Sequence, residues 1–180
     1  MSTRRAPVPL SPASHTGGQA ASGTRQAAGL LVALVATFAA AGLGSVFTSR
    51  SVSDWYAALA RPSWTPPGWV FGPVWTLLYV LMAVAAWLVW RRAGGWAGAR
   101  AALGLYAVQL VLNAAWTGLF FGLRMPGVAF AELAVLWAAI VATLVAFRRH
   151  SPAAGALMVP YLAWCTFAAA LNLAIWRMNV

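Results

Sequence analysis

The chain has 180 residues, of which 62% are hydrophobic and only 8% are charged, and its mean hydropathy is +0.76. Soluble domains carry about a quarter charged residues, so this composition excludes a soluble globular fold. A spanning helix needs about 20 mostly apolar residues, and the chain is therefore long enough for about five spans joined by short loops. We predict an all-α membrane protein with one membrane domain.

The net charge is +10, from twelve basic residues against only Asp54 and Glu132. Such a charge can indicate a nucleic-acid partner. The arginines instead lie at the ends of apolar runs, where they can meet lipid headgroups. These are Arg91, Arg92, Arg100, Arg124, Arg148, Arg149 and Arg177. The placement predicts contact with membrane lipid and no nucleic-acid binding.

Residues 1–26 are rich in Ser, Thr, Pro, Ala, Gly and Gln, which predicts a flexible N-terminal tail. The first apolar run, residues 27–47, follows Arg25 and carries three alanines at 39–41, so a cleaved signal peptide is an alternative. The length of this run, and the four apolar runs after it, favour a spanning helix.

Residues 48–68 form the one substantial loop of the predicted topology. The sequence here is polar and interrupted by prolines, and the pair Pro66-Pro67 blocks regular helix and keeps the backbone extended. We therefore expect Trp64 and Trp69 to stand on a fairly stiff segment.

Four more spans follow in a membrane domain that covers residues 27–179. We place them at residues 69–90, 101–123, 128–147 and 153–176, because the breaks between them combine arginine with Gly or Pro. Five spans put eight arginines on the side of the N-terminus (Arg4, Arg5, Arg25, Arg91, Arg92, Arg100, Arg148, Arg149) and four on the other (Arg50, Arg61, Arg124, Arg177). This bias predicts a cytoplasmic N-terminus, although it falls to six against four without the distant Arg4 and Arg5.

Titratable side chains are few and scattered. Asp54, Glu132, His15 and His150 lie far apart in the sequence, and Cys165 is the only cysteine. Acid and base catalysis needs such groups held together, and we find no metal-ligand spacing, nucleotide-binding glycine loop or nucleophile elbow. The sequence therefore predicts no catalytic residue, no metal and no cofactor, and favours binding over conventional catalysis.

Tryptophan is abundant, with eleven residues. Five near helix ends fit the interfacial belt of a membrane protein: Trp69, Trp87, Trp90, Trp96 and Trp176. Trp75, Trp116 and Trp164 lie deeper in their spans. For these three, an aromatic pocket and ordinary helix packing are both open.

Residues three or four apart share a helix face, and three such faces mix aromatic with polar side chains. They are Trp75-Tyr79-Met82, Gln109-Asn113-Trp116-Phe120 and Tyr161-Trp164-Ala168-Asn172. Asparagine avoids lipid, so Asn113 and Asn172 should point into the bundle, as pocket groups or as simple interhelical hydrogen bonds.

Two further features have more than one interpretation. Gly118 and Gly122 form a Gly-xxx-Gly pair that allows close helix approach, within the chain or across a homodimer. Glu132, the one acid near a span interior, is expected to reach the interface or to pair with an arginine, and a functional site is the alternative.

Three ordered stretches resemble one family. Trp55-Tyr56 precedes PSWTPPGWVFGPVWTLLY, residues 62–79; residues 106–122 read YAVQLVLNAAWTGLFFG; and residues 159–172 read VPYLAWCTFAAALN. These segments are similar to those of the TspO/MBR family of tryptophan-rich sensory and translocator proteins. The resemblance covers residues 27–179.

The resemblance implies a five-helix bundle, commonly dimeric, with an internal pocket for porphyrins such as protoporphyrin and for benzodiazepine-type ligands. Carried over residue by residue, the pocket would be lined by Trp75, Tyr79, Asn113, Trp116, Trp164 and Ala168. Trp55 and Trp64 would belong to a lid formed by the first loop. We assign Gly118 and Gly122 to the dimer interface.

We therefore expect a porphyrin-binding sensor or transport regulator in a membrane, the bacterial cell membrane being the expected location. One alternative is light- or oxygen-dependent breakdown of bound porphyrin beside the pocket tryptophans, and another is transport of small solutes or lipids. The sterol-recognition pattern of vertebrate relatives is incomplete, because Leu173 stands at its tyrosine position and Met178 replaces an acid. Any sterol binding is expected to be weak.

Overall fold

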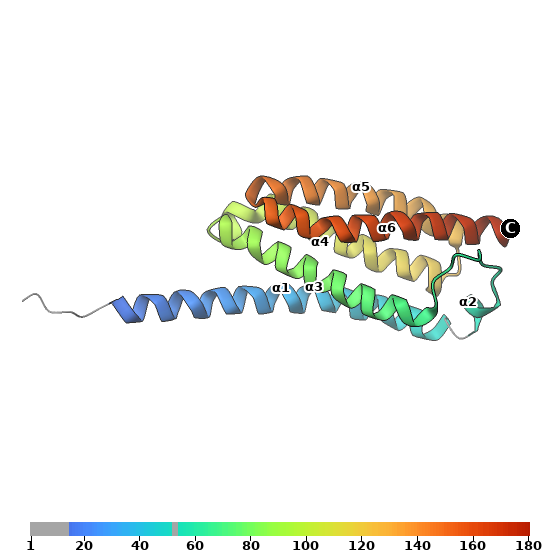
Figure 1. Ribbon diagram of the computed structural model, residues 1–180, viewed down its shortest axis with the longest axis horizontal. Coiled ribbons are helices and arrows are strands. Elements are labelled where there is room, and N and C mark those ends of the chain that lie inside the picture. The colour runs from blue at the N-terminus through green and yellow to red at the C-terminus, as the bar shows by residue number, and fades with distance from the viewer. Residues whose placement is uncertain (1–14, 52–53) are drawn as a thin grey trace, which may run out of the picture.

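The computed structural model describes residues 15–51 and 54–180, with side chains for 23–48, 51 and 54–180. In chain order the elements are α1 (His15–Ser51), α2 (Trp55–Ala58), α3 (Gly68–Arg92), α4 (Trp96–Thr117), the π-helical turn η1 (Gly118–Gly122), α5 (Pro126–His150) and α6 (Pro152–Met178) (Figure 1). The described residues contain no strand. Five helices are long and apolar enough to cross a membrane, which confirms the predicted all-α bundle of five spans.

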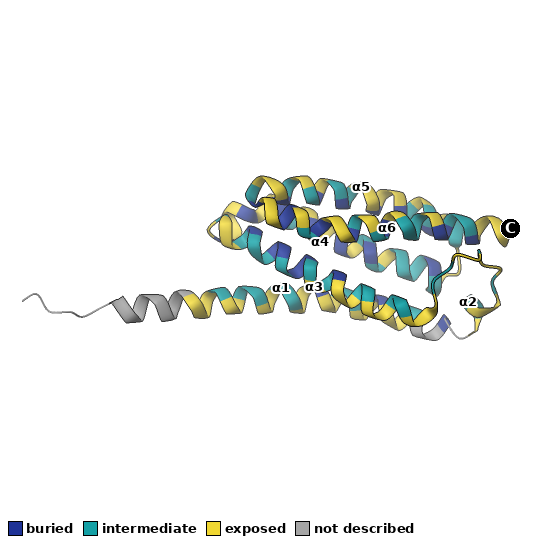
Figure 2. Ribbon diagram, viewed as in Figure 1, coloured by how far each residue is buried: buried dark blue, intermediate teal, exposed yellow. Residues whose placement is uncertain are grey.

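The five long helices lie side by side along the length of the molecule (Figure 1). Helix α5 packs along α6 and α4, while α1 packs against α3 and α4 at the edge of the bundle. Only 11% of the α1 span is buried, against 28% to 33% of the other spans, so α1 is the most exposed of the five spans (Figure 2). Helix α2 and the loop after it cap one end of the bundle, beside the C-terminal end of α6 (Figure 1).

The helix ends follow local sequence chemistry. Gly94 and Gly95 adopt φ values of 73° and 124°, which a residue with a side chain rarely accepts, and they turn the chain tightly between α3 and α4. Helix α4 consequently begins at Trp96, five residues before the predicted start. Proline opens both α5 and α6 at the first turn, and the Ser151 hydroxyl accepts a hydrogen bond from Ala154 N.

Helix α1 begins at His15, whereas a flexible tail was predicted through residue 26. Side chains of α3 contact the last two residues of this segment, Arg25 and Gln26. The Trp87 indole donates a 3.0 Å hydrogen bond to Gln26 O, and the Arg25 guanidinium lies 5.6 Å from the Trp90 ring centre. Residue 27 is therefore not a break in the helix, and residues 1–14 of the predicted tail lie outside the described residues.

The main core lies between α3, α4, α5 and α6 and combines large apolar side chains with alanines. Alanines on α3 and α4 allow close helix approach, as is usual between spanning helices. Helix α1 is tied to this core by a 2.6 Å hydrogen bond between the hydroxyls of Thr37 and Tyr106. The core joins α3, α4, α5 and α6 along most of their length.

Candidate functional site

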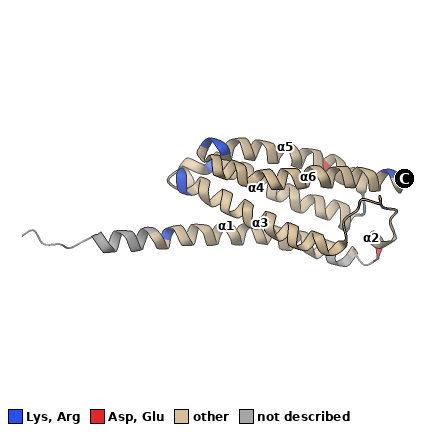
Figure 3. Cartoon of the chain, viewed as in Figure 1, with Lys and Arg blue, Asp and Glu red and all other residues tan. Residues whose placement is uncertain are grey.

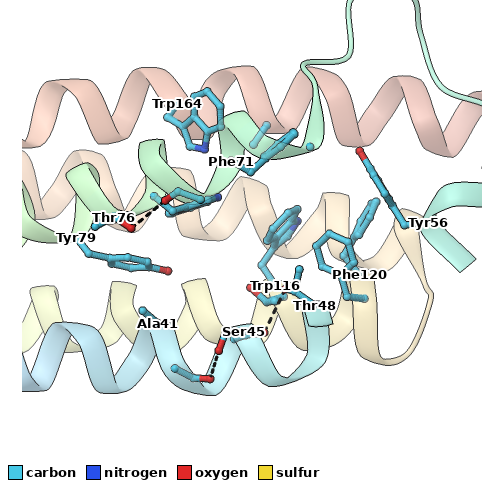
Figure 4. A pocket seen from close by; sticks show the side chains of 18 of the residues that line it. Ala41, Ser45, Thr48, Tyr56, Phe71, Thr76, Tyr79, Trp116, Phe120 and Trp164 are labelled. Carbon is cyan, nitrogen blue, oxygen red and sulfur yellow. Dashed lines mark hydrogen bonds between the residues drawn. The ribbon is translucent and has the colours of Figure 1, made fainter. Parts of the chain in front are cut away.

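A cavity of about 590 Å³ lies at the lid end of the bundle, within the range of small-molecule sites (Figure 4). Its walls come from α1, α2, α3, η1, α6 and the end of α4. Most of the large side chains on these walls are aromatic: Phe38, Tyr56, Phe71, Trp75, Tyr79, Trp116, Phe120, Phe121 and Trp164. The cavity is therefore suited to an apolar, aromatic ligand.

Five of the six side chains predicted for the pocket line this one cavity, namely Trp75, Tyr79, Trp116, Trp164 and Ala168. The sixth, Asn113, is buried behind the wall and does not line it. Its amide oxygen accepts a 2.8 Å hydrogen bond from the Tyr79 hydroxyl, and its nitrogen donates a 3.1 Å bond to the Tyr161 hydroxyl. Asn113 thus holds the Tyr79 ring in place.

Two stacked aromatic pairs form flat surfaces in the cavity wall. Trp75 stacks on Tyr79 within α3, with ring centres 5.4 Å apart and planes 27° apart. Trp116 stacks on Phe120, at 5.5 Å and 24°. Such pairs present extended apolar faces, which match the shape of a planar ligand.

Asn172 fixes the orientation of Trp116. Its side-chain oxygen accepts a 3.1 Å hydrogen bond from the Trp116 indole, and its nitrogen donates a 2.8 Å bond to Pro126 O. Helices α4 and α6 and the start of α5 are thereby joined. Asn113 and Asn172 both point into the bundle, as predicted, and both take part in interhelical hydrogen bonds.

The π-helical turn η1 was not predicted, since the sequence indicated a regular helix through residue 123. Leu123 N donates a 2.8 Å hydrogen bond to Gly118 O, five residues back. The wider turn changes the helical phase, and two successive residues, Phe120 and Phe121, both line the cavity. The turn has glycine at both ends, with Leu119, Phe120 and Phe121 between Gly118 and Gly122.

Other cavity residues were missed for different reasons. Phe71 lies four residues before Trp75 on the same face of α3, so helical spacing alone predicts its position. Phe38 belongs to α1, whose apolar residues show no distinct face, and Tyr56 belongs to the short helix α2. Their positions depend on how α1 and the loop pack against the other helices.

Gly118 and Gly122 allow a close approach within the chain. A Cβ atom at Gly122 would lie 2.9 Å from the Phe47 ring, and one at Gly118 would lie 3.9 Å from it. Helix α1 therefore packs on the glycine face of η1. The homodimer assigned to these glycines stays a prediction, although part of their surface is taken up by α1.

The lid consists of α2 and residues 59–67. Trp55 packs edge-on against Phe120 at 5.6 Å, and Trp64 packs edge-on against Phe167 at 5.8 Å. Neither tryptophan lines the cavity. Tyr56 is the lid residue that does, so the two tryptophans attach the lid to the bundle.

Arg61 places a positive charge beside the cavity. Its guanidinium carbon lies 5.2 Å from the centre of the Tyr56 ring. Burial raises the pKa of Tyr56, and the neighbouring Arg61 opposes that rise. The Tyr56 phenol is therefore neutral near pH 7, and the charge at this point is that of Arg61.

Arginines also gather at the end of the bundle opposite the lid (Figure 3). The Arg25 guanidinium lies beside the turn at Gly95, and Arg91 and Arg92 end α3. By the positive-inside rule, this end is predicted to face the cytoplasm and the lid to face the other side.

Two side chains have buried polar atoms with no hydrogen-bond partner among the described residues, those of Gln109 and Glu132. The carboxylate oxygens of Glu132 lie inside the bundle, so the expected position at the interface or beside an arginine is wrong. Gln109 is fully buried on the α4 face that carries Asn113. Groups of this kind are usually satisfied by buried water.

Five spanning helices and an aromatic cavity beneath a loop define an integral, multi-pass membrane protein with an internal pocket of ligand size. The chain belongs to the TspO/MBR family, whose model matches residues 31–177. It is 46% identical over 138 residues to the translocator protein of Homo sapiens, covering 76% of this chain and 82% of the relative. It is 41% identical over 150 residues to the tryptophan-rich protein TspO of Archaeoglobus fulgidus, covering 83% and 96%. The tryptophan-rich sensory protein of Cereibacter sphaeroides is also 41% identical over 150 residues, with coverage of 82% and 92%.

Proposed function

We propose that this protein binds a porphyrin in the aromatic cavity and acts in the membrane as a tetrapyrrole sensor or transport regulator. One observation carries the proposal: the stacked pairs Trp75-Tyr79 and Trp116-Phe120 present flat apolar faces to one cavity of about 590 Å³. A rigid aromatic macrocycle gains contact area on such faces without losing internal rotations. The names of the relatives, which include a sensory protein and a translocator protein, support the role.

The charge beside the cavity supports an anionic ligand over a neutral one. Protoporphyrin carries its carboxylate groups on one edge of an apolar ring. The apolar ring would occupy the cavity, and its carboxylate edge would face the lid, where Arg61 packs on Tyr56. Arginine binds carboxylates through directed hydrogen bonds as well as through charge.

Protoporphyrin is expected to bind saturably to the purified protein and to quench its tryptophan fluorescence. In Trp75→Phe the affinity should fall about three- to tenfold, because an aromatic contact contributes about 0.5 to 1.5 kcal/mol beyond area burial. The matched control is Trp96→Phe, which removes an indole that is 65% exposed at the other end of the bundle. Equal affinities in the two variants would contradict the assignment of Trp75.

Arg61→Gln is expected to weaken protoporphyrin binding about two- to fivefold, since exposed charge pairs contribute about 0.2 to 1 kcal/mol. The loss of affinity should be smaller at high salt. Salt screens the attraction between Arg61 and the carboxylates in the wild type, so the substitution then removes less of it. A porphyrin with esterified carboxylates serves as the control ligand and should bind both proteins equally. If the ester lost as much affinity as the acid, Arg61 would not be recognising the carboxylates.

A further inference from the structure

The lid is pinned to the C-terminal end of α6 by one side chain. Asn179 accepts a 3.0 Å hydrogen bond from Ala60 N and donates a 2.9 Å bond to Ala60 O. The same amide nitrogen donates a 2.7 Å bond to Ile175 O, which fixes the Asn179 side chain on its own helix. Both backbone polar groups of one lid residue are thus held by α6.

Aromatic contacts hold the rest of the lid down. Trp64 packs against Phe167, while Trp55 and Tyr56 pack against Phe120. Lifting the lid would break these contacts and the Asn179 hydrogen bonds together. Opening the cavity through the lid therefore costs several interactions at once.

The side of the cavity between α1 and α3 differs from the lid, because residues there line the cavity and are also exposed. Gly42 and Ser45 lie on α1, and Gly72 and Thr76 lie on α3. A Cβ atom added at Gly42 or Gly72 would meet no atom within 4 Å. We call these four residues the side mouth.

The side mouth lies within the spanning segments, Gly23–Thr48 of α1 and Gly68–Arg92 of α3. Gly72 and Thr76 follow the start of α3 by about one and two turns, so they lie about 6 and 12 Å along the helix from its end. Gly68, the first residue of α3, also lines the cavity and is exposed, so the opening begins near the lid and continues past Gly72 and Thr76 into the part of the span that lipid surrounds.

The chemistry of the side mouth suits an apolar molecule moving through it. The Ser45 hydroxyl donates a 2.8 Å hydrogen bond to Gly42 O, and the Thr76 hydroxyl donates a 2.9 Å bond to Gly72 O (Figure 4). Both hydroxyls are satisfied inside their own helices. A ligand passing between them displaces no interhelical hydrogen bond.

We propose that ligands exchange directly between the bilayer and the cavity through the side mouth, while Asn179 keeps the lid closed. The ligand class is then a flat amphiphile already dissolved in the membrane. The proposal rests on the proposed function only in requiring that the cavity binds such a molecule. It predicts that a side chain placed in the mouth slows binding and release together.

The test follows protoporphyrin transfer by stopped-flow fluorescence, from donor vesicles into protein reconstituted in vesicles and back. Gly72→Leu should slow both association and dissociation at least tenfold. The control Gly104→Leu adds the same side chain on α4, where a Cβ also meets open space and the cavity is not involved. It should leave both rates within twofold of the wild type.

Asn179→Ala tests the alternative route, in which the ligand passes through the lid. Amide exchange at Ala60 should increase, which reports release of the lid, while porphyrin dissociation stays within twofold of the wild type. The proposal is overturned if Gly72→Leu leaves the rates unchanged, or if Asn179→Ala accelerates release at least tenfold.

A measurement without porphyrin separates this proposal from the proposed function. A membrane-dissolved quencher such as 10-doxylnonane should reach the cavity indoles in the wild type and quench them less in Gly72→Leu, with Gly104→Leu as control. If the wild type bound no porphyrin but showed this difference, the side mouth would stand and the porphyrin assignment would fail. Equal quenching in all three proteins would overturn the side mouth whether or not porphyrin binds.

Discussion

Ala168→Phe is expected to remove most ligand binding and leave the protein folded. Ala168 lines the cavity from α6, one turn after Trp164, so a phenyl ring at this position projects into space the ligand needs. Forcing a ligand and an extra ring together costs about 1 to 3 kcal/mol or more, as overpacking does in protein cores. Protoporphyrin affinity should therefore fall about ten- to a hundredfold.

The fold should tolerate this substitution because the ring enters a cavity and not a packed core. The control is Ala163→Phe, which adds the same ring to the exposed face of α6. Both variants should unfold at denaturant concentrations close to that of the wild type, and only Ala168→Phe should lose binding. Undiminished binding in a folded Ala168→Phe would place the ligand elsewhere.

Asn113→Ala is expected to destabilise the protein by about 1 to 3 kcal/mol. The change removes the acceptor of the Tyr79 hydroxyl and the donor to the Tyr161 hydroxyl. The Tyr161 side chain is fully buried, so its hydroxyl would lose this partner without gaining contact with bulk water. The lower end of this range reflects the modest average contribution of hydrogen bonds between spanning helices.

A mutant cycle in mixed detergent micelles separates the contribution of these hydrogen bonds to the free energy of unfolding from that of packing. In a Tyr79→Phe/Tyr161→Phe background, Asn113→Ala should cost clearly less, because no hydroxyl remains to be left unpaired. Porphyrin affinity should also fall in Asn113→Ala, since the Tyr79 ring is no longer held against Trp75. An equal cost in both backgrounds would show that Asn113 acts by packing alone.

The spans and much of the cavity wall could be predicted because they follow local rules. Each apolar run is long enough to cross a bilayer and is bounded by arginine with Gly or Pro, and the five spans follow from this pattern. Residues four apart on α3 and α6, such as Trp75 with Tyr79 and Trp164 with Ala168, necessarily share a face. Their convergence on one cavity was implied by the family resemblance and not by spacing.

The features that were missed depend on long-range packing. Asn179 and Ala60 are 119 residues apart, and no local pattern predicts their hydrogen bonds. The π-helical turn η1 moves Phe121 into the cavity wall by a change of helical phase. Helix α1 begins at His15, and α3 supplies contacts to Arg25 and Gln26, whereas composition alone predicted a flexible tail.

The most direct test of the cavity as a porphyrin site is an experimental structure of the protein with protoporphyrin bound. The ring is predicted to lie between Trp75, Trp116 and Trp164, with its carboxylate edge towards Arg61 and the lid. Porphyrin density confined to the lipid-facing surface, with the cavity holding another molecule or only solvent, would contradict the proposal.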